Sequence, residues 1–239
     1  YEIMVVDNDS KEPETLAYLR EIERRPNIRV ERISNEGRPF SYARVNNEAV
    51  RRANTEFVLL LNNDTELREP RWLSQMVGHA QMQGVGAVGA KLLFGDGTIQ
   101  HAGIVHGMYG GMAGPAFRNR DCHDWGYLNF LKVSREYAAV TAACLLVRKD
   151  LYERLGGLDE QRFNVAYNDV DFCYRIIDEG LSCVYCADAE LFHYEGKTRG
   201  HRDNPREIAA FRMLYRDRED AWYNPNLSLE DEHFRIRGA

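Results

Sequence analysis

The stretch LLLNNDTEL at positions 59–67 decides the fold, because an apolar run leads there directly into an acid flanked by amides. The three leucines predict a buried β-strand, and no glycine or proline separates them from Asn62, Asn63 and Asp64. Such side chains either accept backbone hydrogen bonds at a turn or helix cap, or they offer oxygen ligands to a metal ion and its phosphates. The rest of the sequence has to distinguish these two interpretations.

Outward from this stretch, apolar strands and amphipathic helices alternate along the first hundred residues. Strands are predicted at 1–7, 27–33, 56–61 and 85–94, with helices between them at 11–25, 41–53 and 70–82. Alternation at this spacing predicts an α/β fold with a mainly parallel sheet and helices on both faces.

The pattern changes from about residue 95. Segment 95–127 is rich in glycine, histidine and aromatic residues without a clean period, so we expect a long functional loop or a β-ribbon over a site. Further elements then follow: a strand at 138–149, a short helix at 150–156, a loop and longer helix at 156–180, two short strands at 181–196, a helix at 204–220 and an extended tail.

Charge and composition narrow the class of function. The 239 residues carry 31 basic and 37 acidic side chains, a net charge of −6, and no basic cluster suited to nucleic acid. The sequence contains no apolar run of about 18 residues, the length that would predict a transmembrane helix. No signal peptide opens the chain. We therefore expect a cytoplasmic protein, either free or peripheral at the inner face of the membrane.

The five cysteines do not form a recognisable framework. Cys183 and Cys186 have CxxC spacing, but they lie in an apolar, β-rich run and no second ligand pair follows. Buried, reduced thiols are therefore favoured over a zinc or redox site.

Polar side chains follow three of the predicted strands. Asp7 ends the first strand, Asn35 follows the second, and Asn62, Asn63 and Asp64 follow the third. Each has an ordinary explanation as a turn or cap, but the carboxyl ends of parallel strands share one edge of a sheet, where ligands bind. No GxGxxG or GxxxxGK[ST] motif is present. If phosphates bind at this edge, a divalent metal has to offset their charge, and a hard oxygen ligand such as that of Asp64 suits Mg²⁺ or Mn²⁺.

Two later clusters carry further candidates. In YNDVDFCYR, Asn168 is suited to cap a helix, with Asp169 and Asp171 in its first turn. Two residues correspond to about 200° of rotation, so only one of these carboxylates can face a site. In HYEGKTRG, His193 ends a strand before a loop with glycine and basic residues, where it is either structurally satisfied or able to bind metal and phosphate.

Taken together and in order, several stretches resemble the inverting family 2 glycosyltransferases of the GT-A fold, of bacterial type. They are VVDNDS, SNEGRPFSYARVNNEAV, LLLNNDTEL, TAACLLVRKDLYERLGGLDE, YNDVDFCYRIIDEG, ELFHYEGKTRG and the tail WYNPNLS, and they cover nearly the whole chain. The resemblance implies transfer of a sugar from a nucleotide-diphosphate donor to an acceptor hydroxyl, with inversion.

The resemblance also assigns roles to single residues. It implies that Asp169 is the catalytic base, that Asp64 and His193 bind Mn²⁺ or Mg²⁺, and that the nucleotide-binding positions are Asp7, Arg44, Asn62 and Asn63. Asn62 stands where the family has the first acid of its DxD motif, and Asn168 where it has glutamate. The acceptor is expected to be a saccharide or a lipid-linked saccharide of cell-surface polysaccharide biosynthesis.

The domain limits follow from the same comparison. Residues 1–202 are expected to form the GT-A domain, with 203–239 as a helix and tail packed on it. The family's first βα unit is missing, so we expect the natural polypeptide to extend upstream of Tyr1 and the strand at 1–7 to lack a neighbour.

Two other classes of function remain open at this stage. One is a non-catalytic sugar-nucleotide-binding or scaffolding module of a larger protein, and the other is a metal-dependent nucleotidyltransferase. The aromatic residues Tyr109, Trp125 and Tyr127 either shape the sugar or acceptor site or pack in the core.

Overall fold

The computed structural model describes residues 1–194 and 204–238. The helices are α1 (Pro13–Ile22), α2 (Tyr42–Arg52), α3 (Trp72–Ala80), α4 (Met108–Gly111), α5 (Lys149–Arg154), α6 (Asn168–Asp178) and α7 (Pro205–Tyr215). The strands are β1 (Ile3–Asp7), β2 (Ile28–Arg32), β3 (Phe57–Leu61), β4 (Thr65–Leu67), β5 (Val85–Leu93), β6 (Ile99–His101), β7 (Ile104–Gly107), β8 (Met112–Pro115), β9 (Arg135–Tyr137), β10 (Cys144–Arg148) and β11 (Ser182–His193).

The central sheet has seven strands, in the order β3-β10-β5-β11-β4, with β6 beside β5 and β9 beside β11. Strands β3, β5 and β11 share one direction, as predicted for a parallel α/β sheet, whereas β10 runs antiparallel to both β3 and β5. The carboxyl ends of β3 and β11 therefore meet at one edge. This edge carries Asn62 and His193, two of the residues singled out in the sequence.

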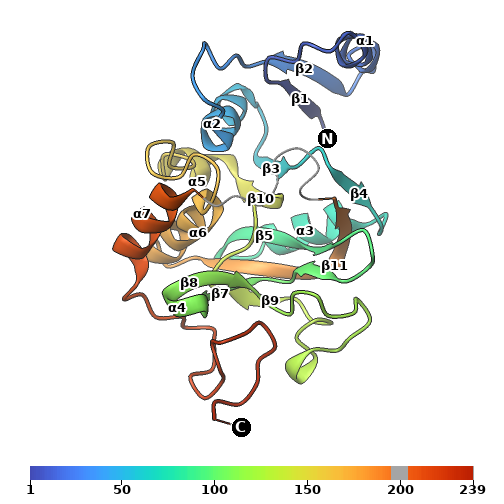
Figure 1. Cartoon of the computed structure of the whole chain (residues 1–239). Helices are drawn as coiled ribbons and strands as arrows, with labels where there is room; N and C mark the ends of the chain where they lie inside the picture. The colour runs from blue at the N-terminus through green and yellow to red at the C-terminus, as the bar shows by residue number, and fades with distance from the viewer. Residues whose placement is uncertain (195–203, 239) are drawn as a thin grey trace.

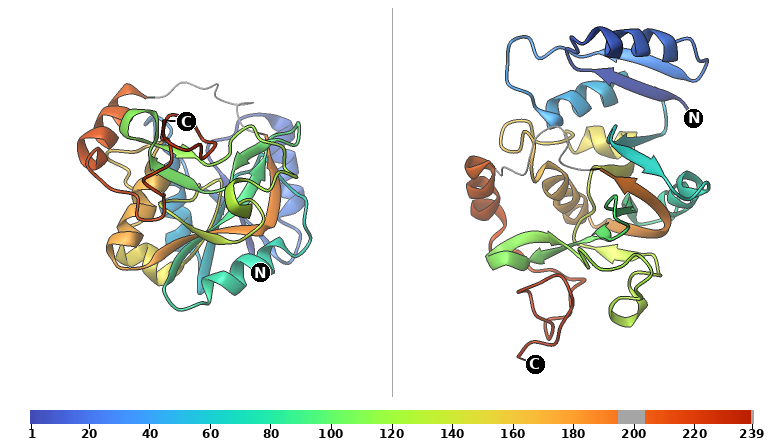
Figure 2. Two further views of the ribbon diagram at one scale, coloured as in Figure 1. Left: turned by 90° about the horizontal axis from the view of Figure 1, so that it is seen from below. Right: turned by 45° about the vertical axis from the view of Figure 1, so that its right-hand side comes forward.

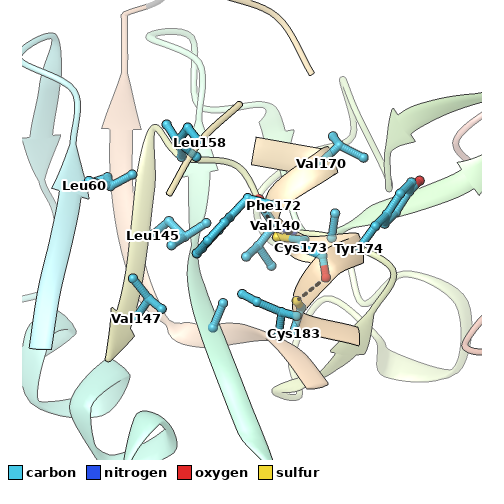
Figure 3. Packing of buried hydrophobic residues seen from close by; sticks show 14 of the residues in the cluster. Leu60, Val140, Leu145, Val147, Leu158, Val170, Phe172, Cys173, Tyr174 and Cys183 are labelled. Carbon is cyan, nitrogen blue, oxygen red and sulfur yellow. Dashed lines mark hydrogen bonds between the residues drawn. The ribbon is translucent and has the colours of Figure 1, made fainter. Parts of the chain in front are cut away.

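Helices cover both faces of the central sheet, as predicted (Figure 1). Neighbouring residues on one strand pack on opposite faces, since side chains alternate along a strand. Leu145 of β10 faces the cluster that includes α2, α5 and α6, and Leu146 faces the cluster that includes α3. Figure 3 shows the first cluster, in which Phe172, Cys173 and other α6 side chains lie against the sheet.

The N-terminal unit stands apart from this sheet. Strands β1 and β2 pair in parallel with one another and carry α1, and β1 has no hydrogen-bonded partner other than β2 among the described strands. Figure 2 shows this unit at one end of the molecule, next to α2. Strand β1 therefore lacks a second neighbour among the described strands, as expected.

The segment after residue 95 forms a ribbon rather than a bare loop. Strands β7 and β8 pair antiparallel, and a third core cluster packs against them. The tail contributes to this cluster, because the ring of Phe234 stacks on that of Phe117 with 4.3 Å between centroids. Tyr127 is half-buried and packs against this cluster beside Phe234, whereas Trp125 is exposed.

Several details differ from the sequence-based expectations. Residues 181–196 were expected to give two short strands, but β11 is a single strand of 12 residues with a register shift between Cys186 and Glu190. The short strand β4 was not predicted, since its three residues carry too little pattern. All five cysteines are buried and free, which confirms the prediction of reduced thiols.

Candidate active site at the tip of strand β3

The turn after β3 brings Asp64 to the end of β11. The carboxylate Oδ1 of Asp64 lies 3.1 Å from Nε2 of His193, and the backbone N–H of Tyr194 donates to the carbonyl of Asp64. His193 is buried, and Oδ1 of Asp64 is buried without a hydrogen-bond partner. An isolated buried carboxylate oxygen is costly, so this atom indicates a missing positive partner.

The hydrogen bonds of His193 define the tautomer of its neutral ring. Nδ1 lies 2.6 Å from Oε1 of Gln100, and an amide oxygen only accepts, so Nδ1 carries the proton. Nε2 is then an acceptor, and the side-chain Nδ2–H of Asn62 donates to it at 3.2 Å. Asp64 Oδ1 and His193 Nε2 are thus two acceptor atoms 3.1 Å apart, an arrangement that fits a divalent cation bound by both in place of the Asn62 amide.

A second group of possible metal ligands lies elsewhere, on the loop that follows β8. Ligand atoms of Asp121, Cys122 and His123 lie within 4.8 Å of one another. However, the guanidinium of Arg68 donates to the Cys122 thiol at 3.6 Å, so a cation already lies beside this group. The pair at the tip of β3 is therefore the better cation site.

Asp169 lies in the first turn of α6 and points toward the segment that precedes β10. Its Oδ2 accepts a hydrogen bond from the backbone N–H of Ala142 at 3.0 Å, and its Oδ1 accepts one from the N–H of Val170 at 2.9 Å. Burial raises the pKa of Asp169 above the ordinary value of 3.8, and these hydrogen bonds partly offset that effect. A carboxylate with a raised pKa is a stronger proton acceptor, as a general base requires.

The backbone of residues 141–143 joins these two groups, a link that no sequence pattern marks. The carbonyl of Ala143 accepts from the N–H of Asn62 at 3.0 Å, and the N–H of Ala142 donates to Asp169. On the other side, the hydroxyl of Tyr42 donates to the carbonyl of Ala142 at 2.9 Å. We name residues 141–143 the bridging segment, because it links the β3 tip to the candidate base.

The second carboxylate of α6 has a structural role. Asp171 is fully buried, and its Oδ2 accepts two hydrogen bonds from Arg175, at 2.8 and 2.9 Å. Its Oδ1 accepts a third, from the hydroxyl of Tyr215. Arg175, one helical turn further along α6, is therefore the ion-pair partner of Asp171.

Asn168 was expected to cap α6, and that expectation is wrong. The cap residue is Tyr167, which has a left-handed backbone with φ of 61°, and Asn168 is the first residue of the helix. The Asn168 side chain instead donates to the carbonyl of Val165 at 2.9 Å.

The residues expected to bind the nucleotide form separate groups. Arg44 is buried on α2, where it donates to the carbonyl of Ser34 and to the side-chain oxygen of Asn35 at 2.7 Å. Asp7 ends β1 and accepts from the N–H of Ser10. Asn63 is exposed in the turn that holds Asp64. The structure brings Asn62, Asp64 and His193 into contact, while the nucleotide roles of Asp7, Arg44, Asn62 and Asn63 stay predictions.

Gly196, Thr198, Arg199 and Gly200, which the sequence offered as a phosphate-holding loop, lie outside the described residues. Among the residues that are described, no helix is long and apolar enough to cross a membrane.

Comparison with known proteins places the chain in a family. The family described as "Glycosyltransferase like family 2" matches residues 1–208, and the chain belongs to this family.

Two relatives align over nearly the whole chain. The "Uncharacterized protein y4gI" of Sinorhizobium fredii is 43% identical over 98% of this chain and 26% of its own length. The "O-antigen biosynthesis protein RfbC" of Myxococcus xanthus is 38% identical over 96% of this chain and 18% of its own length. The chain thus spans about a quarter or less of these relatives.

A relative of Mycobacterium tuberculosis aligns over a shorter stretch. It is named N-acetylglucosaminyl-diphospho-decaprenol L-rhamnosyltransferase and is 27% identical over 59% of this chain and 49% of its own length.

Solved structures agree on the fold. The mannosyltransferase PcManGT from Pyrobaculum calidifontis, in complex with GDP-Man and Mn²⁺, superposes with a TM-score of 0.57 at 20% identity, over 83% of this chain and 49% of its own. GalNAc-T7 with UDP, GalNAc and Mn²⁺ superposes with a TM-score of 0.66 at 12% identity, over 87% of this chain and 41% of its own. The fold is therefore the GT-A fold, as the sequence predicted.

Proposed function

We propose that this chain transfers a sugar from a nucleotide-diphosphate donor to an acceptor hydroxyl, with inversion at the anomeric carbon and with the help of Mn²⁺ or Mg²⁺. The observation that carries the proposal is the unsatisfied Oδ1 of Asp64, which lies 3.1 Å from the acceptor nitrogen Nε2 of His193. Membership of glycosyltransferase family 2 supports the reaction class, and the Mn²⁺ in both solved relatives supports the metal.

In the proposed reaction, Asp169 removes the proton from the acceptor hydroxyl as its oxygen attacks the anomeric carbon. The bond between that carbon and the diphosphate oxygen breaks, and the nucleoside diphosphate leaves from the opposite face, so the configuration inverts. The backbone N–H of Ala142 holds the Asp169 carboxylate in place. Because this carboxylate acts only as a base, no covalent enzyme intermediate is required.

Asp64 and His193 would hold the metal, with the amide of Asn62 beside them. A divalent cation there would supply positive charge to the leaving diphosphate.

The acceptor and the wider role belong to the same proposal. The names of the Myxococcus and Mycobacterium relatives refer to O-antigen biosynthesis and to a diphospho-decaprenol acceptor. By analogy we propose a saccharide or lipid-linked saccharide acceptor, in cell-surface polysaccharide biosynthesis at the inner face of the membrane.

Thermal shift with a panel of nucleoside diphosphates and nucleotide sugars tests the donor site. We expect at least one of them to raise the melting temperature in Mn²⁺ and to lose this effect in excess chelator. Asp64→Asn should abolish the metal-dependent part of the shift, whereas the matched exposed variant Asp217→Asn should behave as wild type. Equal shifts with and without chelator would contradict the metal site.

Product analysis then separates the remaining functions. A glycosyltransferase releases a nucleoside diphosphate, and a nucleotidyltransferase releases pyrophosphate. A non-catalytic binding module gives a thermal shift without turnover.

A further inference from the structure

Two consecutive side chains of β6 contact the two halves of the candidate site. Gln100 and His101 are both buried, and neighbouring residues of a strand point to opposite faces. We propose that they are positioning residues: Gln100 fixes the tautomer of the metal ligand His193, and His101 fixes the bridging segment that holds the base. The metal part of this inference rests on the proposed function.

Gln100 holds His193 at two points. Its Oε1 lies 2.6 Å from Nδ1 of the His193 ring, and its Nε2 donates to the backbone carbonyl of His193 at 3.3 Å. The second contact fixes the orientation of the amide, so that oxygen rather than nitrogen faces the ring. With Nδ1 protonated, Nε2 stays an acceptor, 3.1 Å from Oδ1 of Asp64 and 3.2 Å from the amide nitrogen of Asn62.

Without the Gln100 oxygen, the ring proton of His193 should move from Nδ1 to Nε2. A proton on Nε2 would then donate to Oδ1 of Asp64, which would satisfy the two groups that otherwise bind the cation. The contact between Gln100 and His193 therefore keeps Nε2 able to bind a cation. It also prevents a hydrogen bond from Nε2 to Asp64 that would occupy both ligands.

His101 acts on the other half through the backbone. Its Nδ1 lies 3.0 Å from the carbonyl of Ala90, an acceptor, so Nδ1 carries the proton. Its Nε2 then accepts from the N–H of Thr141 at 3.2 Å, and the next N–H, that of Ala142, donates to Asp169. His101 thus orients the peptide that precedes the donor to the base.

The tautomer of His193 is read by ¹⁵N NMR of the metal-free protein, and Mn²⁺ affinity is read by electron paramagnetic resonance in the presence of a nucleoside diphosphate. We expect Gln100→Leu to move the proton to Nε2 and to weaken Mn²⁺ binding by about 10–100-fold. Gln100→Glu keeps an oxygen acceptor and should keep the Nδ1–H tautomer. Gln161→Leu, at an exposed loop position, is the control and should match wild type in both measurements.

A wild-type tautomer in Gln100→Leu would overturn the role of Gln100, whatever the protein binds. Absence of Mn²⁺ binding by the wild type would instead contradict the proposed function, because the tautomer is measured without metal.

His101→Phe and His101→Gln test the second half. Phenylalanine removes the acceptor for Thr141, so kcat should fall on the order of 10–100-fold while Mn²⁺ affinity stays at the wild-type value. Glutamine can donate to Ala90 and accept from Thr141, so it should restore most of kcat. An unchanged kcat in a folded His101→Phe protein, or a kcat in His101→Gln as low as that expected for phenylalanine, would overturn this role.

Discussion

At the scale of single residues, the two carboxylates of α6 show how environment assigns roles. Asp169 accepts backbone N–H bonds from Ala142 and Val170 and a side-chain hydrogen bond from Thr141, and none of these described partners carries a positive charge. Asp171 is enclosed by Arg175 and Tyr215 and has no remaining capacity to act as a base. The rotation along the helix already implied that only one of these carboxylates can face a site. The structure indicates that Asp169 is the one available to act as a base.

We expect Asp169→Asn to lower transfer by roughly 10²-fold or more while donor affinity stays unchanged, because the amide keeps the size of the side chain and loses its basicity. The folded pKa of Asp169 is raised, so ionisation of this group costs stability as pH rises through that pKa. Asp169→Asn removes that cost but turns one of the two acceptor oxygens into an N–H donor, so the two effects oppose one another and the melting temperature at neutral pH should change little. Initial rates, donor titration and thermal denaturation check the three expectations.

Asp171→Asn serves as the control and should give the opposite result. The substitution leaves Arg175 without its charged partner, and we expect a loss on the order of 2–3 kcal/mol in unfolding free energy. Activity per folded molecule should remain. Near-normal turnover in Asp169→Asn together with an inactive, folded Asp171→Asn would show that the base is Asp171.

The pH dependence of transfer follows from the same group. A base works only when ionised, and burial raises the pKa of Asp169, so the acid limb of kcat should have its midpoint above pH 3.8. Below that midpoint the rate should fall tenfold per pH unit. A rate that is undiminished at pH 3.8, in a protein still folded by circular dichroism, would exclude this carboxylate as the base.

At the scale of elements, α2 was predicted together with its cap. Ser41 is the N-cap, and its hydroxyl oxygen accepts from the N–H of Arg44 at 3.2 Å. We expect Ser41→Ala to cost about 1 kcal/mol of unfolding free energy. Ser74→Ala, in the first turn of α3, is the matched control and should lose clearly less, because the Ser74 hydroxyl donates to the carbonyl of Arg71 rather than capping an N–H and alanine is the better helix former. Chemical denaturation of both variants checks this, and equal losses would contradict the cap.

Other elements could not be predicted, for identifiable reasons. The contact of Gln100 with His193 spans 93 residues, and β6 has only three residues in a segment without periodicity. The bridging segment acts through backbone N–H and C=O groups, which every residue carries, so no side-chain pattern marks it. By contrast, Asp64 follows a strand and Asp169 lies in the first turn of a helix, and such boundaries can be predicted from sequence.

At the scale of the whole molecule, the N-terminal unit and the central sheet differ in burial. Within residues 1–34 only Asp7, Ile22 and Ile33 are buried, whereas nearly all of β5 is buried. A two-stranded sheet with little buried apolar surface is marginal by itself.

We therefore expect amide hydrogens of β1 and β2 to exchange faster than those of β5, β10 and β11, because local opening of this unit costs less than global unfolding. Hydrogen exchange followed by mass spectrometry checks the expectation. Equal protection of the two regions would show that the N-terminal unit unfolds only with the central sheet.

The arrangement of the chain as a whole places Asp64, His193 and Asp169 around one sheet edge, and their joint function is tested by following the products of a single reaction. With an active nucleotide sugar, Mn²⁺ and an acceptor, NMR should show a nucleoside diphosphate and a glycoside of inverted anomeric configuration. Chelator, Asp64→Asn and Asp169→Asn should each suppress both products. Release of pyrophosphate, retention of configuration, or full turnover in excess chelator would contradict metal-assisted inverting transfer at this site.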